Sequence, residues 1–450
     1  MSAQKPSTGS GRLAAALALA RETKALLIEP GALRHGAPLF AAQFPGIKAL
    51  VVADTTTFAV AGIKAQDALA AAGLAESAPL ILPAKGLYAE YRWVEVLQEH
   101  FARHDAVPVA VGSGTINDLV KLAAHLTGRS YLCVATAASM DGYTAYGASI
   151  TRDGSKQTFA CPAPQAVLAD LDILAAAPPA MTASGYADLQ AKLTAGADWI
   201  LADELGVEPI DPEVWAIVQD DLRTALAAPA AARAGEPAAI AALTTGLMLG
   251  GFAMQRHQTS RPASGAEHQF SHLWDMEHLT GEDGAPSHGF KVGVATLAVA
   301  ALYEAMLRRP LEHLDVAACC AAWPDWSVTE KQIHTLFGAG DFIATPLREA
   351  QIKHPSREAL HDQLQRLKSR WPQLRDRVRK HLPPAAALRR NLELAGAPVT
   401  PEAIGLTQAR LRDSFLRACH IRRRFTVLDL AVRTGLLDKC LAEIFPAAPV

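Results

Sequence analysis

The first 180 residues switch hydrophobic period several times, and this feature constrains the fold more than any other. Short apolar runs of strand length stand at 25–28, 49–53, 107–111, 131–135 and 166–169. Between two of these runs, apolar side chains recur at helical spacing from Ile116 to Leu126. Strands that alternate with helices indicate a parallel sheet covered by helices. We therefore predict an α/β domain over residues 1–180.

The second part of the chain has a different character. From about Met181 onward, Ala, Leu, Glu, Arg and Lys dominate, and runs of β-branched residues disappear. Helical patterns extend over 239–254, 290–307, 355–380 and 407–424. The Pro178-Pro179 pair is a plausible boundary, because proline interrupts regular structure. We predict an all-helical domain over residues 181–450.

The bulk composition excludes several classes of partner. Lys and Arg number 43 against 45 Asp and Glu, so charge gives no reason to expect nucleic acid or an anionic membrane surface. The apolar stretch 292–307 is interrupted by Glu304 and is shorter than the roughly 20 residues of a membrane span. Leu13–Ala20 reads as a helix rather than a signal peptide. The six cysteines form no CxxC pair, which favours reduced thiols and a cytoplasmic protein.

A glycine-rich turn follows the third predicted strand. Gly112-Ser113-Gly114-Thr115 connects that strand to the helix that extends to Leu126. Glycines at such a junction allow the backbone to approach a pyrophosphate, and free N–H groups at a helix start favour negative charge. Many strand–helix turns carry glycine for steric reasons alone. The full GxGxxG fingerprint is absent, because position 117 is Asn.

Asp54 ends the second predicted strand and is a candidate for binding a ribose hydroxyl. No Arg or Lys follows before Ile63 to bind a 2′-phosphate, which favours NAD over NADP. Asp54 precedes the glycine turn, whereas the usual fingerprint places its acid about 20 residues after it. A dinucleotide-binding fold here is therefore a variant Rossmann domain. The alternative is that Asp54 caps a helix or turn.

Three residues in the second part suggest a metal site. Asp188 is expected near the start of the first helix of the helical domain, and His288 opens another predicted helix. His268 and His272 are four residues apart and share one face of a helix. Imidazole and carboxylate together suit Zn²⁺ or a similar ion, and three protein ligands leave room for a substrate oxygen. The chain has 15 histidines, so spacing alone does not single out these ligands.

Taken together, the motifs resemble a known family. They are IEPGAL (28–33), VVAD (51–54), GSGTINDLVK (112–121), ATAASMDGYTAYGASI (135–150), VLADLDIL (167–174), SGYADLQAK (184–192), SGAEHQFSH (264–272), HGFKVGVATL (288–297), TPEAIGL (400–406) and IRRRFTVLDL (421–430). In this order they resemble the bacterial and archaeal sn-glycerol-1-phosphate dehydrogenases. That family lies within the iron-containing alcohol dehydrogenase and dehydroquinate synthase superfamily, so the resemblance implies a dehydroquinate synthase-like fold.

The resemblance also implies roles for individual residues. Asp188, His268 and His288 would bind one divalent metal ion, typically zinc, with nickel or iron as alternatives. Asp141, Asp188 and His272 would contact the substrate and form the catalytic group. NAD, with NADP as the alternative, would lie against a longer set of residues: Asp54, Gly112, Gly114, Thr115, Ile116, Asn117, Asp118, Thr136, Ala137, Ala138, Ser139 and Ala145.

The sequence departs from the family pattern at two places. Ala145 stands where the family usually has a serine near the cofactor, which removes one hydrogen bond. Phe290 and Lys291 replace the usual acidic and amide residues after the His-Gly pair. Lys291 could pair with a phosphate. We expect it instead to be solvated, because charged helix residues are usually exposed.

The resemblance predicts a dehydrogenase that interconverts dihydroxyacetone phosphate and sn-glycerol 1-phosphate. It implies a small-molecule substrate, no nucleic acid or membrane span, a cytoplasmic location and a homo-oligomer. The departures leave open a dehydrogenase of another polyol or polyol phosphate. A dehydroquinate synthase-like lyase is a further alternative, although that branch carries more Lys and Arg around its substrate. Net consumption of NADH would exclude the lyase.

Overall fold

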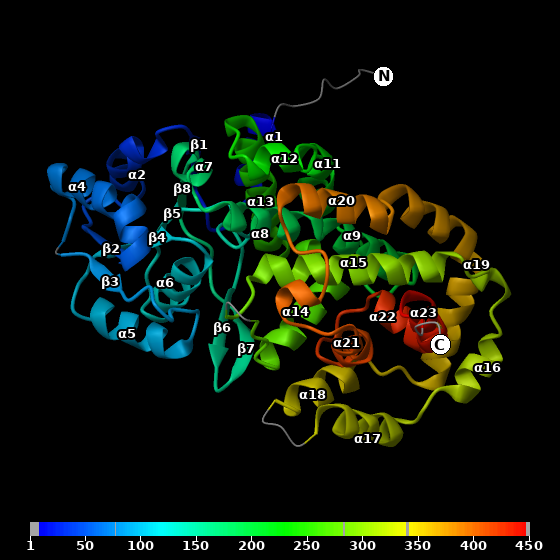
Figure 1. Cartoon of the computed structure of the whole chain (residues 1–450). Helices are drawn as coiled ribbons and strands as arrows, with labels where there is room; N and C mark the ends of the chain where they lie inside the picture. Colours follow the sequence, from blue (N-terminus) through cyan, green and yellow to red (C-terminus); the bar gives the residue numbers. More distant parts are fainter. Residues whose placement is uncertain (1–8, 77, 282–283, 339–341, 447–450) are drawn as a thin grey trace. The chain divides into compact units, whose positions relative to one another are not determined.

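The computed structural model describes residues 9–76, 78–281, 284–338 and 342–446 (Figure 1). The chain forms two compact units. The first comprises Met1–Leu189, Glu213–Pro262 and Leu394–Gly396, and the second Gln190–Pro212, Ala263–Glu393 and Ala397–Val450. The division after Leu189 falls within a helix. Residues 213–262 lie beyond the predicted boundary near residue 180 but group with the first unit. The two predicted domains, 1–180 and 181–450, stay a prediction.

The first unit contains a six-stranded sheet with the order β1-β8-β5-β4-β2-β3. Its strands are β1 (Ala25–Glu29), β2 (Ala49–Asp54), β3 (Leu80–Leu82), β4 (Val107–Gly112), β5 (Leu132–Ala135) and β8 (Ala166–Asp170). Every neighbouring pair is parallel. All five predicted strands are present, and the predicted α/β class is confirmed. The sequence analysis missed β3 and the antiparallel hairpin of β6 (Ala148–Arg152) and β7 (Ser155–Phe159).

Helices cover both faces of this sheet. Alternate residues of β2, such as Leu50 and Val52, lie in one buried cluster with Leu97 of α5 (Tyr91–Phe101). The residues between them, such as Val51, lie in a second cluster with Phe40 of α2 (Gly36–Gln43). A parallel sheet that is buried on both faces needs apolar side chains on both faces. This explains why its strands read as continuous apolar runs.

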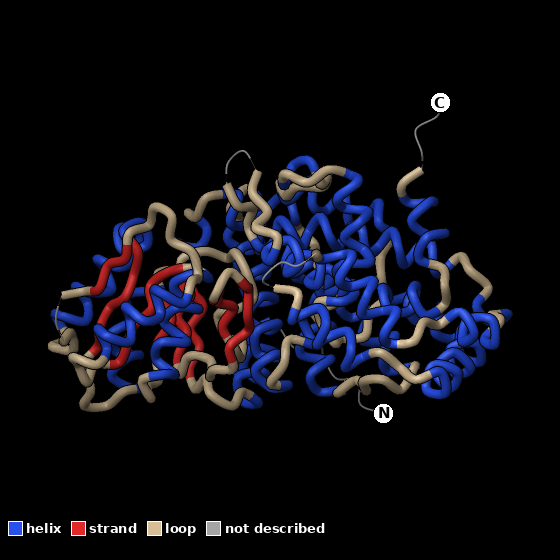
Figure 2. Tube along the Cα trace, turned by 90° about the horizontal axis from the view of Figure 1, so that it is seen from below, coloured by secondary structure: helices blue, strands red, loops and turns tan. Residues whose placement is uncertain are grey.

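Nearly all the remaining elements are helices (Figure 2). The other helices are α1 (Gly9–Leu19), α3 (Thr55–Thr57), α4 (Ile63–Ala71), α6 (Gly114–Leu126), α7 (Leu171–Ala175), α8 (Pro179–Gln190), α9 (Lys192–Glu204), α10 (Pro212–Gln219), α11 (Leu222–Ala225), α12 (Pro229–Arg233), α13 (Pro237–His257), α14 (Ala266–Met276), α15 (His288–Leu307), α16 (Val316–Ala322), α17 (Trp326–Phe337), α18 (Ala344–Lys353), α19 (Arg357–His381), α20 (Ala385–Ala395), α21 (Gln408–His420), α22 (Val427–Arg433) and α23 (Leu437–Ile444). The four long helices predicted after residue 181 correspond to α13, α15, α19 and α21. The helical character of this part of the chain is therefore confirmed.

Among the described residues, α13 and α15 are long and apolar enough to span a bilayer by length and composition alone. Most of each helix is nevertheless buried, with 72% of the apolar window covered in α13 and 83% in α15. Helices that are apolar on all sides are typical of protein cores as well as of membranes. This degree of burial is the pattern of a core helix.

Candidate active site

The glycine turn lies between β4 and α6, as predicted. Gly112 ends the strand, and a Cβ atom there would stand 2.6 Å from the Cβ of Ile116, so only glycine fits. Helix α6 begins at Gly114, and its N-cap residue Ser113 makes no capping hydrogen bond through its side chain. Uncapped N–H groups at the start of a 13-residue helix favour an anion. The turn is therefore suited to a pyrophosphate, although its close packing supplies a steric reason for Gly112 as well.

The side chains in the first turns of α6 point into the first unit. Asn117 is fully buried, accepts a hydrogen bond from the hydroxyl of Tyr131 at 3.0 Å and donates one to the carbonyl of Gly142 at 3.2 Å. Asp118 accepts from the backbone N–H of Ser149 at 3.1 Å, and burial raises its pKa. Both side chains thus serve the packing of the unit. Contacts between these two residues and a cofactor stay predictions.

Asp54 ends β2 and caps the short helix α3. Its Oδ1 accepts from the backbone N–H groups of Thr56 at 2.8 Å and Thr57 at 2.9 Å. In return, the Thr57 hydroxyl accepts from the N–H of Asp54 at 3.1 Å, which completes a capping box. The capping alternative raised by the sequence is therefore present. A ribose contact from Asp54 stays a prediction.

The other predicted cofactor residues lie in the segment that follows β5. Thr136, Ala137 and Ala138 are buried, and Ala145 is 5% exposed. Helix α8 approaches the backbone of this segment closely, because a Cβ at Gly185 would stand 1.9 Å from the carbonyl oxygen of Ala138. Such an approach permits only glycine at position 185. The SGYAD motif thus has a packing role beside the predicted cofactor segment.

Asp188 lies near the end of α8, not at the start of a helix as predicted from the sequence. The helix begins at Pro179, because proline is well tolerated in the first turn. The carboxylate is fully buried, and its Oδ2 accepts from the backbone N–H of Asp141 at 3.1 Å. This hydrogen bond places two predicted substrate residues side by side.

The predicted histidines lie on two helices of the second unit. His268 and His272 are both on α14, as their spacing predicts, and His288 is the first residue of α15. The ring centroid of His288 lies 5.3 Å from that of His268 and 6.4 Å from that of His272. The Nδ1 atom of His288 lies 3.3 Å from the hydroxyl of Ser271. The three imidazoles therefore form one cluster.

Buried Glu267 orients His268. Its Oε1 lies 2.8 Å from Nδ1 of His268 and accepts from the N–H of Gly265 at 2.6 Å, while Oε2 accepts from the hydroxyl of Thr194 at 2.8 Å. Burial alone would raise the pKa of Glu267, but these hydrogen bonds lower the pKa below its ordinary value. An ionised carboxylate can only accept, so His268 carries its proton on Nδ1 and presents the lone pair of Nε2.

A second buried carboxylate fixes the start of α14. Asp198 of α9 accepts from the backbone N–H of Ala266 at 2.7 Å. It also accepts from the hydroxyl of Tyr303 at 2.5 Å and from the N–H of Val427 at 2.8 Å. Gly265 leaves room for this arrangement, since a Cβ there would stand 2.5 Å from Asp198 Oδ2. The histidine helix therefore begins at a defined point.

Within the described part of the chain, one group of side chains has the arrangement of a metal site. Asp188, His268 and His288 each offer one ligand atom, and these atoms all lie within 4.8 Å of one another. The ligand set is two imidazoles and one carboxylate, which suits zinc and related divalent ions. These are the three residues that the sequence analysis selected.

Lys291 differs from its prediction. We expected a solvated side chain, but Lys291 is 6% exposed and forms an ion pair with Asp275 of α14. Helix α15 is covered over most of its surface, and Lys291 in its first turn is enclosed, whereas Glu304 near its end is exposed. The amphiphilic pattern that usually marks an exposed lysine does not apply to such a helix.

Sequence reasoning gave no role to three buried charged residues near the predicted site, Lys121, Asp198 and Glu267. A signal existed for each of them. Lys121 and Asp198 are flanked by apolar residues, and Glu267 stands directly before a proposed ligand. The partners of Asp198 could not be inferred, because Tyr303 and Val427 are more than 100 residues away in the sequence.

Several known proteins are similar to this chain in sequence. A family model described as iron-containing alcohol dehydrogenase matches residues 27–178. A protein of Halalkalibacterium halodurans named glycerol-1-phosphate dehydrogenase [NAD(P)+] is 38% identical over 265 residues, which cover 58% of this chain and 66% of the relative. A protein of Bacillus licheniformis with the same name is 32% identical over 297 residues, which cover 65% of this chain and 74% of the relative.

A solved structure supports the fold. A probable glycerol dehydrogenase from Sinorhizobium meliloti aligns with a TM-score of 0.57 at 18% identity, covering 94% of this chain and 98% of that one. This likeness concerns the fold alone. The first sequence relatives match over slightly less than two thirds of their own length, between 64% and 66%.

Proposed function

Because the chain belongs to the glycerol-1-phosphate dehydrogenase family, among the iron-containing alcohol dehydrogenases, we propose that it interconverts dihydroxyacetone phosphate and sn-glycerol 1-phosphate. The proposed cofactors are NAD, with NADP as the alternative, and one divalent metal ion. The observation that carries the proposal is the Asp188, His268 and His288 cluster, whose ligand atoms lie within 4.8 Å of one another. The three residues come from three of the motifs that resemble the family, namely SGYADLQAK, SGAEHQFSH and HGFKVGVATL.

The donor chemistry of this cluster fits a metal ion. Glu267 binds Nδ1 of His268, which leaves Nε2 as the lone-pair donor. A ligating histidine typically donates its other ring N–H to a carboxylate in this way, which fixes the tautomer and raises the basicity of the ligand. We propose that Asp188, His268 and His288 bind zinc, with nickel or iron as alternatives. Polarisation of the substrate C2 oxygen is the chemistry that such an ion supplies when bound.

The chain's own residues would bind and orient the substrate. Hydride transfer at C2 is the chemistry of the nicotinamide ring, and the protein determines which face of the substrate meets it. Asp141, whose N–H donates to Asp188, would accept a hydrogen bond from a substrate hydroxyl. His272 would donate to the substrate and pass a proton to or from the C2 oxygen, because an imidazole titrates near neutral pH.

A second substrate class has two observations in its favour. Ala145 lacks the hydroxyl that the family usually has near the cofactor. Lys291, the lysine closest in sequence to His288, is buried against Asp275, so its charge is already neutralised. Another polyol or polyol phosphate is therefore the alternative substrate. Either way, we propose a cytoplasmic, homo-oligomeric enzyme that acts on a small molecule.

The test compares substrates and one variant. With NADH, we expect dihydroxyacetone phosphate to be reduced with a higher kcat/KM than dihydroxyacetone, because binding of the phosphoryl group helps to position C2. His272→Ala should impair this reduction while the bound metal, measured by mass spectrometry, is unchanged. His334→Ala, a change at an exposed histidine of α17, is the matched control. A higher kcat/KM with dihydroxyacetone than with dihydroxyacetone phosphate would reject the phosphate-specific proposal. In the reverse direction, a higher kcat/KM with glycerol than with sn-glycerol 1-phosphate would also reject it.

A further inference from the structure

The segment from Thr136 to Gly147 contains no helix or strand, yet most of its residues are buried. We call it the 136–147 loop. It follows β5 and carries Asp141 together with most of the predicted cofactor residues outside the glycine turn. Buried peptide groups need hydrogen-bond partners, and a segment without regular structure must find them in other elements. The partners of this loop therefore determine its shape.

Lys121 of α6 supplies three of these partners. The side chain is fully buried, and its Nζ donates to the carbonyl oxygens of Gly142 at 2.9 Å, Ala145 at 3.0 Å and Gly147 at 3.0 Å. An ammonium group has three N–H donors, so these carbonyls use all of them. The nearest carboxylate oxygen, on Asp118, lies 3.8 Å away. Lys121 thus binds the loop mainly through backbone carbonyls.

Helix α13 contacts the same loop through a different set of atoms. The hydroxyl of Thr144 donates to the carbonyl of Met248 at 2.7 Å, and the Nε2 of Gln255 donates to the carbonyl of Thr144 at 2.9 Å. A Cβ at Gly251 would stand 2.7 Å from the carbonyl oxygen of Asp141, so the helix backbone lies directly against the loop. Lys121 differs from these contacts in that its one side chain joins three peptide groups of the loop.

We propose that Lys121 is a positioning residue that sets the 136–147 loop in the conformation that presents Asp141 and the backbone of residues 136–139 to the substrate and cofactor. The three carbonyl dipoles point their negative ends toward one buried position, which a cation neutralises and an apolar group does not. Without the ammonium, the carbonyls would turn toward other donors and the loop would rearrange. The role assigned to the loop rests on the proposed function, whereas the ordering of the loop does not.

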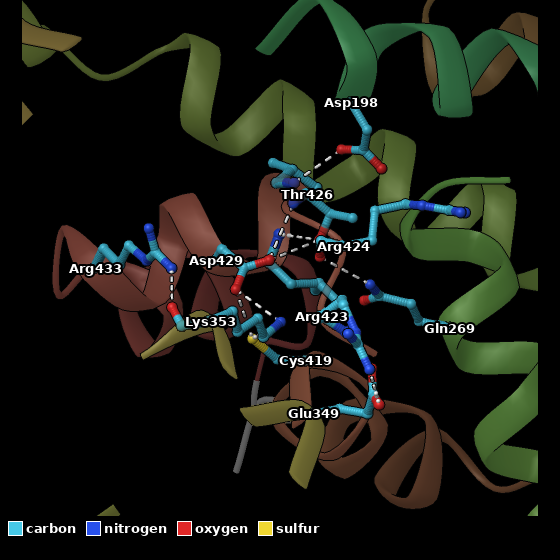
Figure 3. Close-up of polar contacts among 12 residues, drawn as sticks. Asp198, Gln269, Glu349, Lys353, Cys419, Arg423, Arg424, Thr426, Asp429 and Arg433 are labelled. Atoms are coloured by element: carbon cyan, nitrogen blue, oxygen red, sulfur yellow. Dashed lines mark hydrogen bonds and ion pairs between the residues drawn. The ribbon is translucent and has the colours of Figure 1, made fainter. Parts of the chain in front are cut away.

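The experiment compares Lys121→Met with Lys353→Met. Lys353 is a matched control in the second unit, with a side chain 10% exposed, and it pairs with Asp429 at 2.8 Å (Figure 3). Hydrogen exchange of the ligand-free proteins comes first. We expect faster exchange of the amides of residues 136–147 in Lys121→Met and unchanged exchange there in Lys353→Met.

Kinetics then test the consequence for the site. We expect kcat/KM for dihydroxyacetone phosphate to fall by about a hundredfold in Lys121→Met, since misplacement by about 1 Å can have that effect. We expect Lys353→Met to stay near the wild-type value once the folded fraction is taken into account. Unchanged exchange in the 136–147 loop of folded Lys121→Met would overturn the proposal. So would equal kinetic losses in both variants.

Two further variants cover the case in which Lys121→Met does not fold. Lys121→Gln keeps a donor, and Thr144→Val removes one hydrogen bond of the same loop while keeping its shape. Faster loop exchange in Lys121→Gln than in Thr144→Val would support the proposal, and wild-type exchange in Lys121→Gln would overturn it. If the loop responds to Lys121 but wild type does not reduce dihydroxyacetone phosphate, the proposed function fails and the ordering role stands.

Discussion

The 136–147 loop and the start of α14 are built in opposite ways. In the loop, a buried cation, Lys121, binds backbone carbonyls and determines the path of the main chain. At the start of α14, the buried anions Glu267 and Asp198 bind backbone N–H groups, and Glu267 also binds the ring of His268. In each region the buried side chain has the charge that its backbone partners need: a cation binds C=O groups, and carboxylates bind N–H groups.

The two regions differ in whether side chains or backbone groups are expected to contact the ligand. The predicted cofactor segment includes Ala137, Ala138 and Ala145, whose methyl groups offer no hydrogen bonds, so its recognition depends on the backbone. The α14 region depends on imidazoles, whose ring nitrogens must point in one direction. We therefore expect single substitutions to have large effects at the histidines and smaller effects at the cofactor segment.

Loss of a metal ligand should have the largest effect. His268→Ala and His288→Ala should each lower kcat/KM by about a thousandfold or more, because a Lewis acid contributes several kcal/mol and each 1.4 kcal/mol is about tenfold in rate. Metal content should fall, while circular dichroism shows a folded protein. Near wild-type turnover with full metal content in either variant would remove that residue from the ligand set.

A change in the partner of a ligand should have a smaller effect. Glu267→Gln keeps the shape of the side chain but weakens its hold on Nδ1 of His268, and changes of this kind typically lower metal affinity by about 10- to 100-fold. A zinc competition titration would measure this loss. Unaltered zinc affinity would contradict the orienting role of Glu267.

Glu349→Gln is the matched control for that titration. Glu349 is also a buried carboxylate of the second unit, but its partners are Arg423, as Figure 3 shows, and Arg348. Burial alone would raise its pKa, yet the hydrogen bonds from Arg423 and Arg348 lower the pKa to about 2. We expect Glu349→Gln to affect stability but not zinc affinity.

The cofactor side should respond more modestly. Asp54 would repel a 2′-phosphate, so we expect a higher kcat/KM with NADH than with NADPH. Asp54→Asn should reduce this preference by about tenfold, since a polar contact is commonly worth about 1–3 kcal/mol. Asparagine caps helices as well as aspartate does, so the capping box around Thr57 should remain and stability should change little. Equal or higher kcat/KM with NADPH in wild type would remove Asp54 from the ribose site.

The smallest effect is expected at Ala145. Ala145→Ser restores the hydroxyl that the family usually has at this position, and one added hydrogen bond is worth about 0.5–1.5 kcal/mol. The dissociation constant for NADH, measured by fluorescence, should therefore decrease by up to about tenfold. A weaker affinity would indicate that the buried methyl of Ala145, which is 5% exposed, has no room for an oxygen atom.

The sequence predicted the elements that have a strong local pattern. All five predicted strands are in the sheet, because buried parallel strands are apolar on both faces. Strand β3 has only three residues, Leu80–Leu82. The hairpin lies outside that sheet, and its strand β7 has four polar residues before Phe159. Such short or exposed strands leave little signal in one sequence.

The candidate site divides in the same way. The histidines and Asp188 were selected because the motifs that carry them resemble those of the family, whereas residue type and spacing alone did not single them out. The exposure of Lys291 was predicted wrongly, because α15 packs against α9, α14, α22 and α23, and one sequence does not show this packing. Asp198 was missed for a related reason, since its role depends on the N–H groups of Ala266 and Val427. Partners of this kind become visible only in the folded chain.

The most direct test of the account is an NADH oxidation assay with dihydroxyacetone phosphate on metal-stripped and zinc-reloaded protein. The account predicts no turnover after stripping, and recovery as zinc binds at the site formed by Asp188, His268 and His288. His268→Ala should not recover under the same conditions. Full turnover in protein shown by mass spectrometry to be free of metal would contradict the central claim.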